Sequence, residues 1–235
     1  AAHSNTLDVC PLPVQERAAH LHSPSPYIPQ QPQEAAITAT ALTLIVGLAA
    51  TLPQDGDFQR LRLSETFYSE GASFGDVNGD GHGDVVSGPF WYEGPDFEQA
   101  HEFKPAEASD PLKYSDDFFS WVFDIDGDGD MDVFQVGFPG KLAAWFRNPS
   151  PRTGHWQYNP IFAGVDNESP TFADIDGDGR PELVCNHRGA FGYIAANWSD
   201  PAQPWDWHPI SPDLKKHRFT HGLGVGDVNG DGRPD

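Results

Sequence analysis

The sequence predicts an all-β protein, a β-propeller of four-stranded antiparallel blades, of which this chain holds about three to four. The first observation behind this prediction is an acidic nine-residue run that recurs four times, with starts 48, 50 and 53 residues apart. The second is that 24 glycines and 22 prolines among 235 residues disfavour long helices and favour short strands joined by turns. Four short strands in a period of about 50 residues are typical of a propeller blade.

Apolar segments surround each acidic run, and we expect them to be the four strands of one blade. The innermost strand precedes the run, at 72–75, 120–123, 171–173 and 222–226. The second strand follows the run, at 85–86, 133–136 and 183–185. The third strand lies at 90–92, 142–146 and 191–195, and the last is clearest at 156–162 and 205–210, with an equivalent strand at 58–63 before the first unit. Because one blade cannot bury both of its faces, neighbouring blades are expected to stack around an axis.

The composition divides the chain into three segments. Residues 1–34 are rich in Pro, Gln, Ala and His without an apolar period, and they are predicted to be disordered. Residues 35–52 carry no charge. Their length and the small residues at their C-terminal end favour a secretory signal, with a membrane anchor or a buried helix as alternatives. Residues 58–235 form the propeller part, about three complete blades and the start of another, so we expect a longer full protein or an open arc.

The charge of the chain excludes some partners. With 35 acidic and 14 basic side chains, the net charge is −21. Nucleic-acid phosphates and anionic membranes would repel such a chain, so neither is expected as a partner, except for a membrane reached through the N-terminal anchor. The four runs contain 15 of the 35 acidic residues, and charge concentrated in this way indicates a bound cation.

The runs read Asp-x-Asp/Asn-x-Asp-Gly-x-x-Asp/Glu and place side-chain oxygens at positions 1, 3, 5 and 9. Such donors suit Ca²⁺ better than Mg²⁺, because Ca²⁺ accepts irregular shells of many oxygens. An EF-hand is excluded, since position 12 lacks its glutamate and strands flank the loop. We expect Ca²⁺ to be part of the fold and structural. The predicted ligands are Asp76, Asn78, Asp80 and Asp84; Asp124, Asp126, Asp128 and Asp132; Asp174, Asp176, Asp178 and Glu182; and Asp227, Asn229, Asp231 and Asp235.

These repeats resemble the FG-GAP/VCBS family, the calcium-loop propellers also seen in integrin alpha subunits, over about residues 58–235. The calcium loops match position by position, and the Phe-Gly…Gly-Ala-Pro signature survives only as Phe74-Gly75 and Ser87-Gly-Pro89. The resemblance implies that each loop joins the innermost strand of a blade to the second strand. It also implies that complete propellers usually have seven blades.

If the calcium loops all lie on one face, the turns between second and third strands and the blade connections lie on the other. That opposite face would collect His187 and Arg188 from one blade and His221 from the next. We expect the three side chains to lie close enough to share an anionic or sugar ligand, with Arg188 as a bidentate donor. The alternative is that they are simply solvated loop residues.

Two classes of function fit these features. The first is a secreted, periplasmic or cell-surface module, stabilised by Ca²⁺, that binds carbohydrate or extracellular protein, as in adhesion. The second is a carbohydrate-active lyase or isomerase with a site opposite the calcium loops. The aldos-2-ulose dehydratases are similar in having a propeller with such loops. Histidines and acids clustered around the axis would favour the enzyme, whereas scattered side chains and an aromatic shelf would favour the binding module.

Overall fold

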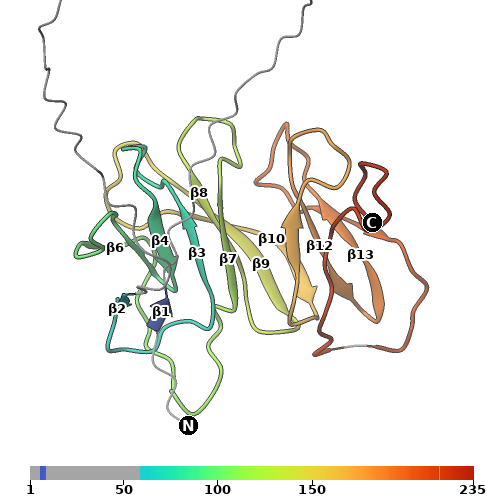
Figure 1. Cartoon of the computed structure of the whole chain (residues 1–235), viewed down its shortest axis with the longest axis horizontal. Coiled ribbons are helices and arrows are strands. Elements are labelled where there is room, and N and C mark those ends of the chain that lie inside the picture. Colours follow the sequence, from blue (N-terminus) through green and yellow to red (C-terminus); the bar gives the residue numbers. More distant parts are fainter. Residues whose placement is uncertain (1–5, 9–58, 217) are drawn as a thin grey trace, which may run out of the picture. The chain divides into compact units, whose positions relative to one another are not determined.

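A computed structural model describes residues 6–8, 59–216 and 218–235 of the chain (Figure 1). These residues form strands, turns and loops without a helix, which confirms the predicted all-β class. Two short strands, β1 (Thr6–Asp8) and β2 (Arg60–Arg62), form a two-stranded sheet. The three sheets and the loops described below lie in residues 62–235, which belong to one compact unit of the chain.

Three four-stranded antiparallel sheets follow one another along the chain, and in each the strands pair in chain order. Sheet 1 consists of β3 (Ala72–Gly75), β4 (Asp84–Ser87), β5 (Phe90–Tyr92) and β6 (Ala100–Glu102). Sheet 2 consists of β7 (Phe119–Phe123), β8 (Asp132–Val136), β9 (Lys141–Arg147) and β10 (Gln157–Val165). Sheet 3 consists of β11 (Thr171–Ala173), β12 (Glu182–His187), β13 (Ala190–Ala195) and β14 (Asp206–Pro209). The three sheets confirm the prediction of incomplete propeller-like blades.

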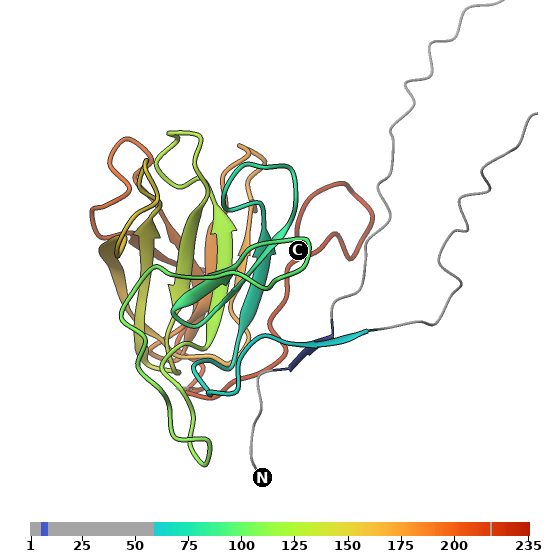
Figure 2. The same cartoon turned by 90° about the vertical axis from the view of Figure 1, so that its left-hand side faces the viewer.

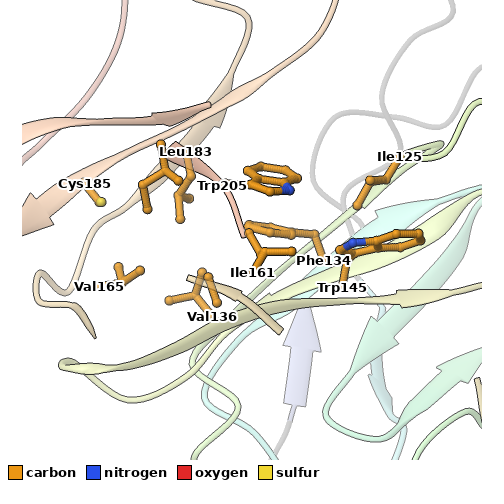
Figure 3. Packing of buried hydrophobic residues seen from close by; sticks show 11 residues of the cluster. Ile125, Phe134, Val136, Trp145, Ile161, Val165, Leu183, Cys185 and Trp205 are labelled. Carbon is orange, nitrogen blue, oxygen red and sulfur yellow. The ribbon is translucent and has the colours of Figure 1, made fainter. Parts of the chain in front are cut away.

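Sheet 2 is covered on both faces, and the side chains of successive residues in its strands pack into two separate hydrophobic cores. In β8, Val133 belongs to a core shared with sheet 1, whereas the next residue, Phe134, belongs to a core shared with sheet 3. Figure 3 shows the second core, in which the ring of Phe134 stacks on that of Trp205 at a centroid distance of 5.5 Å. Successive side chains of a strand point to opposite faces, so a blade between two neighbours requires apolar side chains on both faces of its middle strands.

The same ends of the three sheets carry the acidic runs. Each run connects the first strand of a sheet to its second strand, and Figures 1 and 2 show these three loops side by side at the top. The β8–β9 and β12–β13 turns and the connections between sheets lie at the other end. The innermost strands of sheets 1 and 2 are joined by a hydrogen bond of 3.1 Å between the hydroxyls of Ser73 and Ser120.

Some expectations differ from the structure or lie outside it. The strand predicted at 58–63 overlaps β2, which pairs with β1 and belongs to no blade. The fourth innermost strand, expected at 222–226, does not form, because no strand of the described chain pairs with these largely exposed residues. The expected disorder of 1–34 and signal of 35–52 lie outside the described residues, apart from β1. The described part of the chain contains no helix that is long and apolar enough to cross a membrane.

Candidate metal centres

The four acidic runs, named loop 1 (76–84), loop 2 (124–132), loop 3 (174–182) and loop 4 (227–235), close in the same way. In loops 1 to 3, the residue before the run and the residue at position 9 are partners in the antiparallel ladder. In loop 4, Asp235 donates its backbone N–H to the Gly226 carbonyl at 2.8 Å. Loop 4 therefore keeps the closure of the other loops, although its flanking strands are missing.

The side chain at position 1 organises the backbone of every loop. In loop 2, Oδ1 of Asp124 accepts the N–H of Gly127 at 2.8 Å, and Oδ2 accepts the N–H of Gly129 at 3.0 Å. Asp126 at position 3 accepts the N–H of Asp128 at 3.2 Å, and Asp128 at position 5 accepts the N–H of Asp130 at 2.9 Å. Asp76, Asp174 and Asp227 make the equivalent two bonds at position 1. The backbone thus holds the oxygens at positions 1, 3 and 5 in place.

The carboxylate at position 9 is buried and connects the loop to the strands beneath it. Asp132 is fully buried, and its Oδ2 accepts the N–H of Ile125 at 3.0 Å while its Oδ1 accepts that of Asn148 at 2.8 Å. Asp84 makes the same two connections in loop 1, to Val77 at 2.7 Å and Gly94 at 2.8 Å. Each position-9 side chain therefore fixes the second residue of its loop and, in sheets 1 and 2, the end of the third strand.

Burial of these side chains disfavours their charged form. Burial raises the pKa of Asp132 to about 7, although the two backbone N–H groups oppose the change. Burial also raises the pKa of Asp84 and of Glu182. A cation beside these carboxylates would stabilise their charged form, so the loops have the electrostatics expected of a metal site.

Carboxylate oxygens converge in two of the loops. In loop 2, Asp124, Asp126 and Asp128 each place one oxygen within 4.8 Å of the others. In loop 3, the corresponding group is Asp174, Asp176 and Glu182. The donor set consists of oxygens alone, which fits a hard divalent cation such as Ca²⁺.

Loop 2 has a feature that the sequence did not indicate, a guanidinium at its carboxylates. Arg147, the last residue of β9, places Nε 2.6 Å from Oδ2 of Asp126 and a terminal nitrogen 3.1 Å from Oδ2 of Asp128. Arg152 pairs with Asp130, at position 7 of the same loop. No pattern distinguishes these arginines in the sequence, because each lies beyond the loop and reaches its carboxylate only through the folding of the chain.

Asn148 links loop 1 to loop 2. This residue is 1 % exposed, and its side-chain amide donates to the Val77 carbonyl at 3.0 Å and to the Met131 carbonyl at 2.9 Å. Val77 is in loop 1 and Met131 is in loop 2. Loops 1 and 2, which belong to neighbouring sheets, therefore share one buried side chain.

Two of the three predicted ligand residues of the opposite face line a common cavity. His187 and Arg188 line a cavity between sheets 2 and 3 together with Asp166 and Arg218. His221 is exposed, and its Nε2 lies 2.8 Å from Oε2 of Glu168. The structure places Arg188 N–H, not its guanidinium, on a carboxylate, since this N–H donates to Oδ2 of Asp166 at 2.8 Å.

Repeated four-stranded sheets with an acidic loop after each first strand define a propeller-type repeat protein. Residues 124–185, which run from loop 2 into β12, match the family model of the FG-GAP-like repeat. This segment is similar to an FG-GAP-like repeat, which confirms over these residues the resemblance predicted from the sequence. None of the curated proteins and none of the solved structures compared with the chain matches it.

Proposed function

We propose that this chain is a calcium-binding propeller module that is exported and binds carbohydrate or protein outside the cytoplasm. The observation that carries the proposal is the identical hydrogen bonding of four loops. In each loop, the backbone orients carboxylate or amide oxygens at positions 1, 3 and 5, and a carboxylate at position 9 holds position 2. A repeated arrangement of this kind supports a cation at each loop.

Calcium would have a structural role at these sites. Asp124, Asp126, Asp128 and Asp132 of loop 2 would hold it, with the equivalent residues in the other loops. Bound there, the cation supplies positive charge that offsets the repulsion among neighbouring carboxylates. The loops connect the first and second strands of the sheets, so a loop fixed by calcium also fixes the strand pair below it.

The cavities support a binding module over a lyase. A cavity of about 530 Å³ runs along the innermost strands and is lined by the rings of Phe74, Trp121, Phe123 and Phe172, which fits the expected aromatic shelf. In the cavity that contains His187, the only lining carboxylate is Asp166. Both of its oxygens are engaged, one with Arg188 N–H and one with Arg218, so this cavity has no free carboxylate among its described lining residues.

Calcium titration of the whole chain tests the proposal. The melting temperature and the bound calcium would be measured after EDTA treatment and during addition of CaCl₂ or MgCl₂. We expect calcium to raise the melting temperature by several degrees at millimolar concentration, with a smaller effect of magnesium. An EDTA-treated protein with an unchanged melting temperature and no measurable calcium binding would refute the proposal.

Loop 2 supplies a matched pair of variants. Asp128→Asn removes a carboxylate of the converging group at position 5, where all four loops carry Asp, whereas Asp130→Asn removes one at position 7, where the backbone carbonyl is the expected ligand. We expect Asp128→Asn to lower the number of tightly bound calcium ions by one and Asp130→Asn to leave it unchanged. An equal loss in both variants would indicate unspecific attraction to acidic charge.

A further inference from the structure

A second cavity, of about 460 Å³, lies between sheets 2 and 3, at the ends of the strands opposite the metal loops. Its volume falls in the range of small-molecule sites, about 300–1,000 Å³. The lining comes from the β8–β9 turn, the end of β10, the β12–β13 turn and the segment after β14. The lining residues used in the argument are Gly140, Gly164, Asp166, His187, Arg188 and Arg218.

Basic groups predominate in this cavity, although the chain as a whole carries a net charge of −21. Two guanidinium groups and an imidazole face one carboxylate, that of Asp166. This carboxylate is 9 % exposed, and its Oδ1 lies 3.4 Å from Nε of Arg218. Since Asp166 balances Arg218, the charge of Arg188 remains unbalanced within the cavity.

Arg188 has no hydrogen bond or ion pair to its guanidinium within the described part of the chain, and the residue is exposed. Its backbone has φ of 49°, in the left-handed region that an L side chain adopts at some cost. The bond from its N–H to Asp166 holds this conformation. Glycine would fit the turn without strain, so the conformation gives no structural reason for arginine at this position.

His187 is fixed beside the cavity with one nitrogen free. Its Nδ1 donates to the Gly164 carbonyl at 2.7 Å, which leaves Nε2 without a partner among the described residues. The ring packs edge-on against Phe162 and Trp207, at centroid distances of 4.9 and 5.3 Å. A Cβ added to Gly164 would lie 3.1 Å from the imidazole, so the glycine provides room for this ring.

Arg218 is positioned in a similar way over a second glycine. A Cβ added to Gly140 would lie 2.4 Å from Cζ of Arg218, which places the guanidinium directly against the glycine backbone. Gly140 donates its N–H to the Val165 carbonyl within sheet 2, and Arg218 reaches this glycine from the segment after sheet 3. The two arginines and His187 thus belong to one ordered junction.

We propose that this cavity binds a carboxylate-bearing sugar such as a uronic acid, with Arg188 as the bidentate donor to the carboxylate. A planar guanidinium matches two carboxylate oxygens, and His187 Nε2 and Arg218 add polar contacts for hydroxyl groups. A small ligand fits better than a protein, because a stable protein interface covers about 800 Å² on each partner. The inference deepens the proposed function by naming the class of carbohydrate.

Calorimetric titration of the calcium-saturated chain with galacturonate and with galactose tests the inference, since the two sugars differ only in the carboxylate. We expect galacturonate to bind at least about tenfold more tightly than galactose, as a charged hydrogen-bonded pair would give. Its affinity should fall as NaCl is raised. Equal affinity for the two sugars, or binding of neither, would overturn the inference.

Arg188→Gly is the informative variant, because glycine tolerates the observed φ and keeps the N–H bonded to Asp166. We expect it to lose about tenfold or more in galacturonate affinity while the melting temperature stays the same or rises. Arg62→Ala removes the same charge from an exposed pair with Glu65 and should bind as the unchanged chain does. Wild-type affinity in Arg188→Gly would overturn the inference.

Further titrations separate other ligand sources. Phosphate, sulfate or a glutamate-rich peptide that bound as tightly as galacturonate would contradict a sugar-acid site. The calcium experiment is independent of these titrations. If calcium stabilises the chain but galacturonate does not bind, this inference alone fails, whereas the proposed function fails if calcium has no effect.

Discussion

Nε of Arg147 lies 2.6 Å from Oδ2 of Asp126, so a guanidinium is bound to one of the carboxylates expected to hold calcium. The same side chain reaches Asp128 at 3.1 Å. Sheets 1 and 3 show no ion pair of this kind at their loops among the described residues. Loop 2 therefore differs from its neighbours in having a cationic competitor of its own.

The first prediction is that Arg147→Gln raises the calcium affinity of loop 2. A partly exposed ion pair is worth up to about 1 kcal/mol, which corresponds to about fivefold in affinity. The same variant should melt at a lower temperature in EDTA, because the carboxylates lose their counter-charge. Calcium titration would measure both effects. Arg152→Gln, which acts on Asp130 outside the donor set, should change the affinity less, and an equal gain would point to net charge alone.

The second prediction concerns the connection between loops 1 and 2. Asn148→Ala removes both donors to the carbonyls of Val77 and Met131 at a buried position. Two buried acceptors without partners lower the free energy of unfolding by about 2–4 kcal/mol. Chemical denaturation would measure the loss. Asn197→Ala, at an exposed residue, is the control and should change stability by less than about 0.5 kcal/mol.

Much of the fold could be predicted from the sequence, because the repeat sets both the strand order and the loop positions. The runs at 133–136 and 183–185 became β8 and β12, since both faces of a middle strand must be apolar. The pattern of the sequence does not indicate β6, because Ala100–Glu102 is short and does not alternate clearly. The fourth innermost strand failed for another reason, since a strand needs a partner as well as a favourable sequence.

The site was predictable where it is local and not where it depends on tertiary contacts. The nine-residue pattern indicates the ligands at positions 1, 3 and 5, whose bonds stay within the loop. It does not show that Asp132 accepts the backbone N–H of Asn148, or that Arg147 reaches two carboxylates, because these contacts join distant segments. The pairing of His221 with Glu168 is tertiary in the same way.

The third prediction concerns the backbone of the loops. Gly129 has φ of 93° and its N–H is bonded to Asp124, so alanine would be strained although its Cβ has open space. Gly129→Ala should lower stability by about 1–2 kcal/mol and weaken calcium binding at loop 2. Gly224→Ala, which has open space and no such φ, is the control. Equal melting temperatures for the two variants would contradict the expected role of the left-handed conformation.

The fourth prediction is a pH dependence of the calcium-free protein. Burial raises the pKa of Asp132 to about 7 in the folded chain, against about 4 in the unfolded chain. Between these values the folded state binds more protons, so stability rises as the pH falls. From pH 7.5 to pH 5.5 the gain should be about 2 kcal/mol for this one group. Asp84 and Glu182, whose pKa values are also raised by burial, act in the same direction.

Calcium should reverse this trend, because a bound cation stabilises the charged carboxylates and protons compete with it. The difference in melting temperature between calcium and EDTA should therefore shrink as the pH falls from 7.5 to 5.5.

The side chain in Asp132→Asn cannot titrate, so in EDTA the stability of this variant should depend less on pH. The variant is less stable overall, because its amide group meets a backbone N–H. Asp110→Asn is the control, since hydrogen bonding to Leu112 lowers the pKa of that exposed carboxyl and places its titration below this range. An equal change in stability between pH 7.5 and 5.5 for the calcium-free chain and for its Asp132→Asn variant would contradict the prediction.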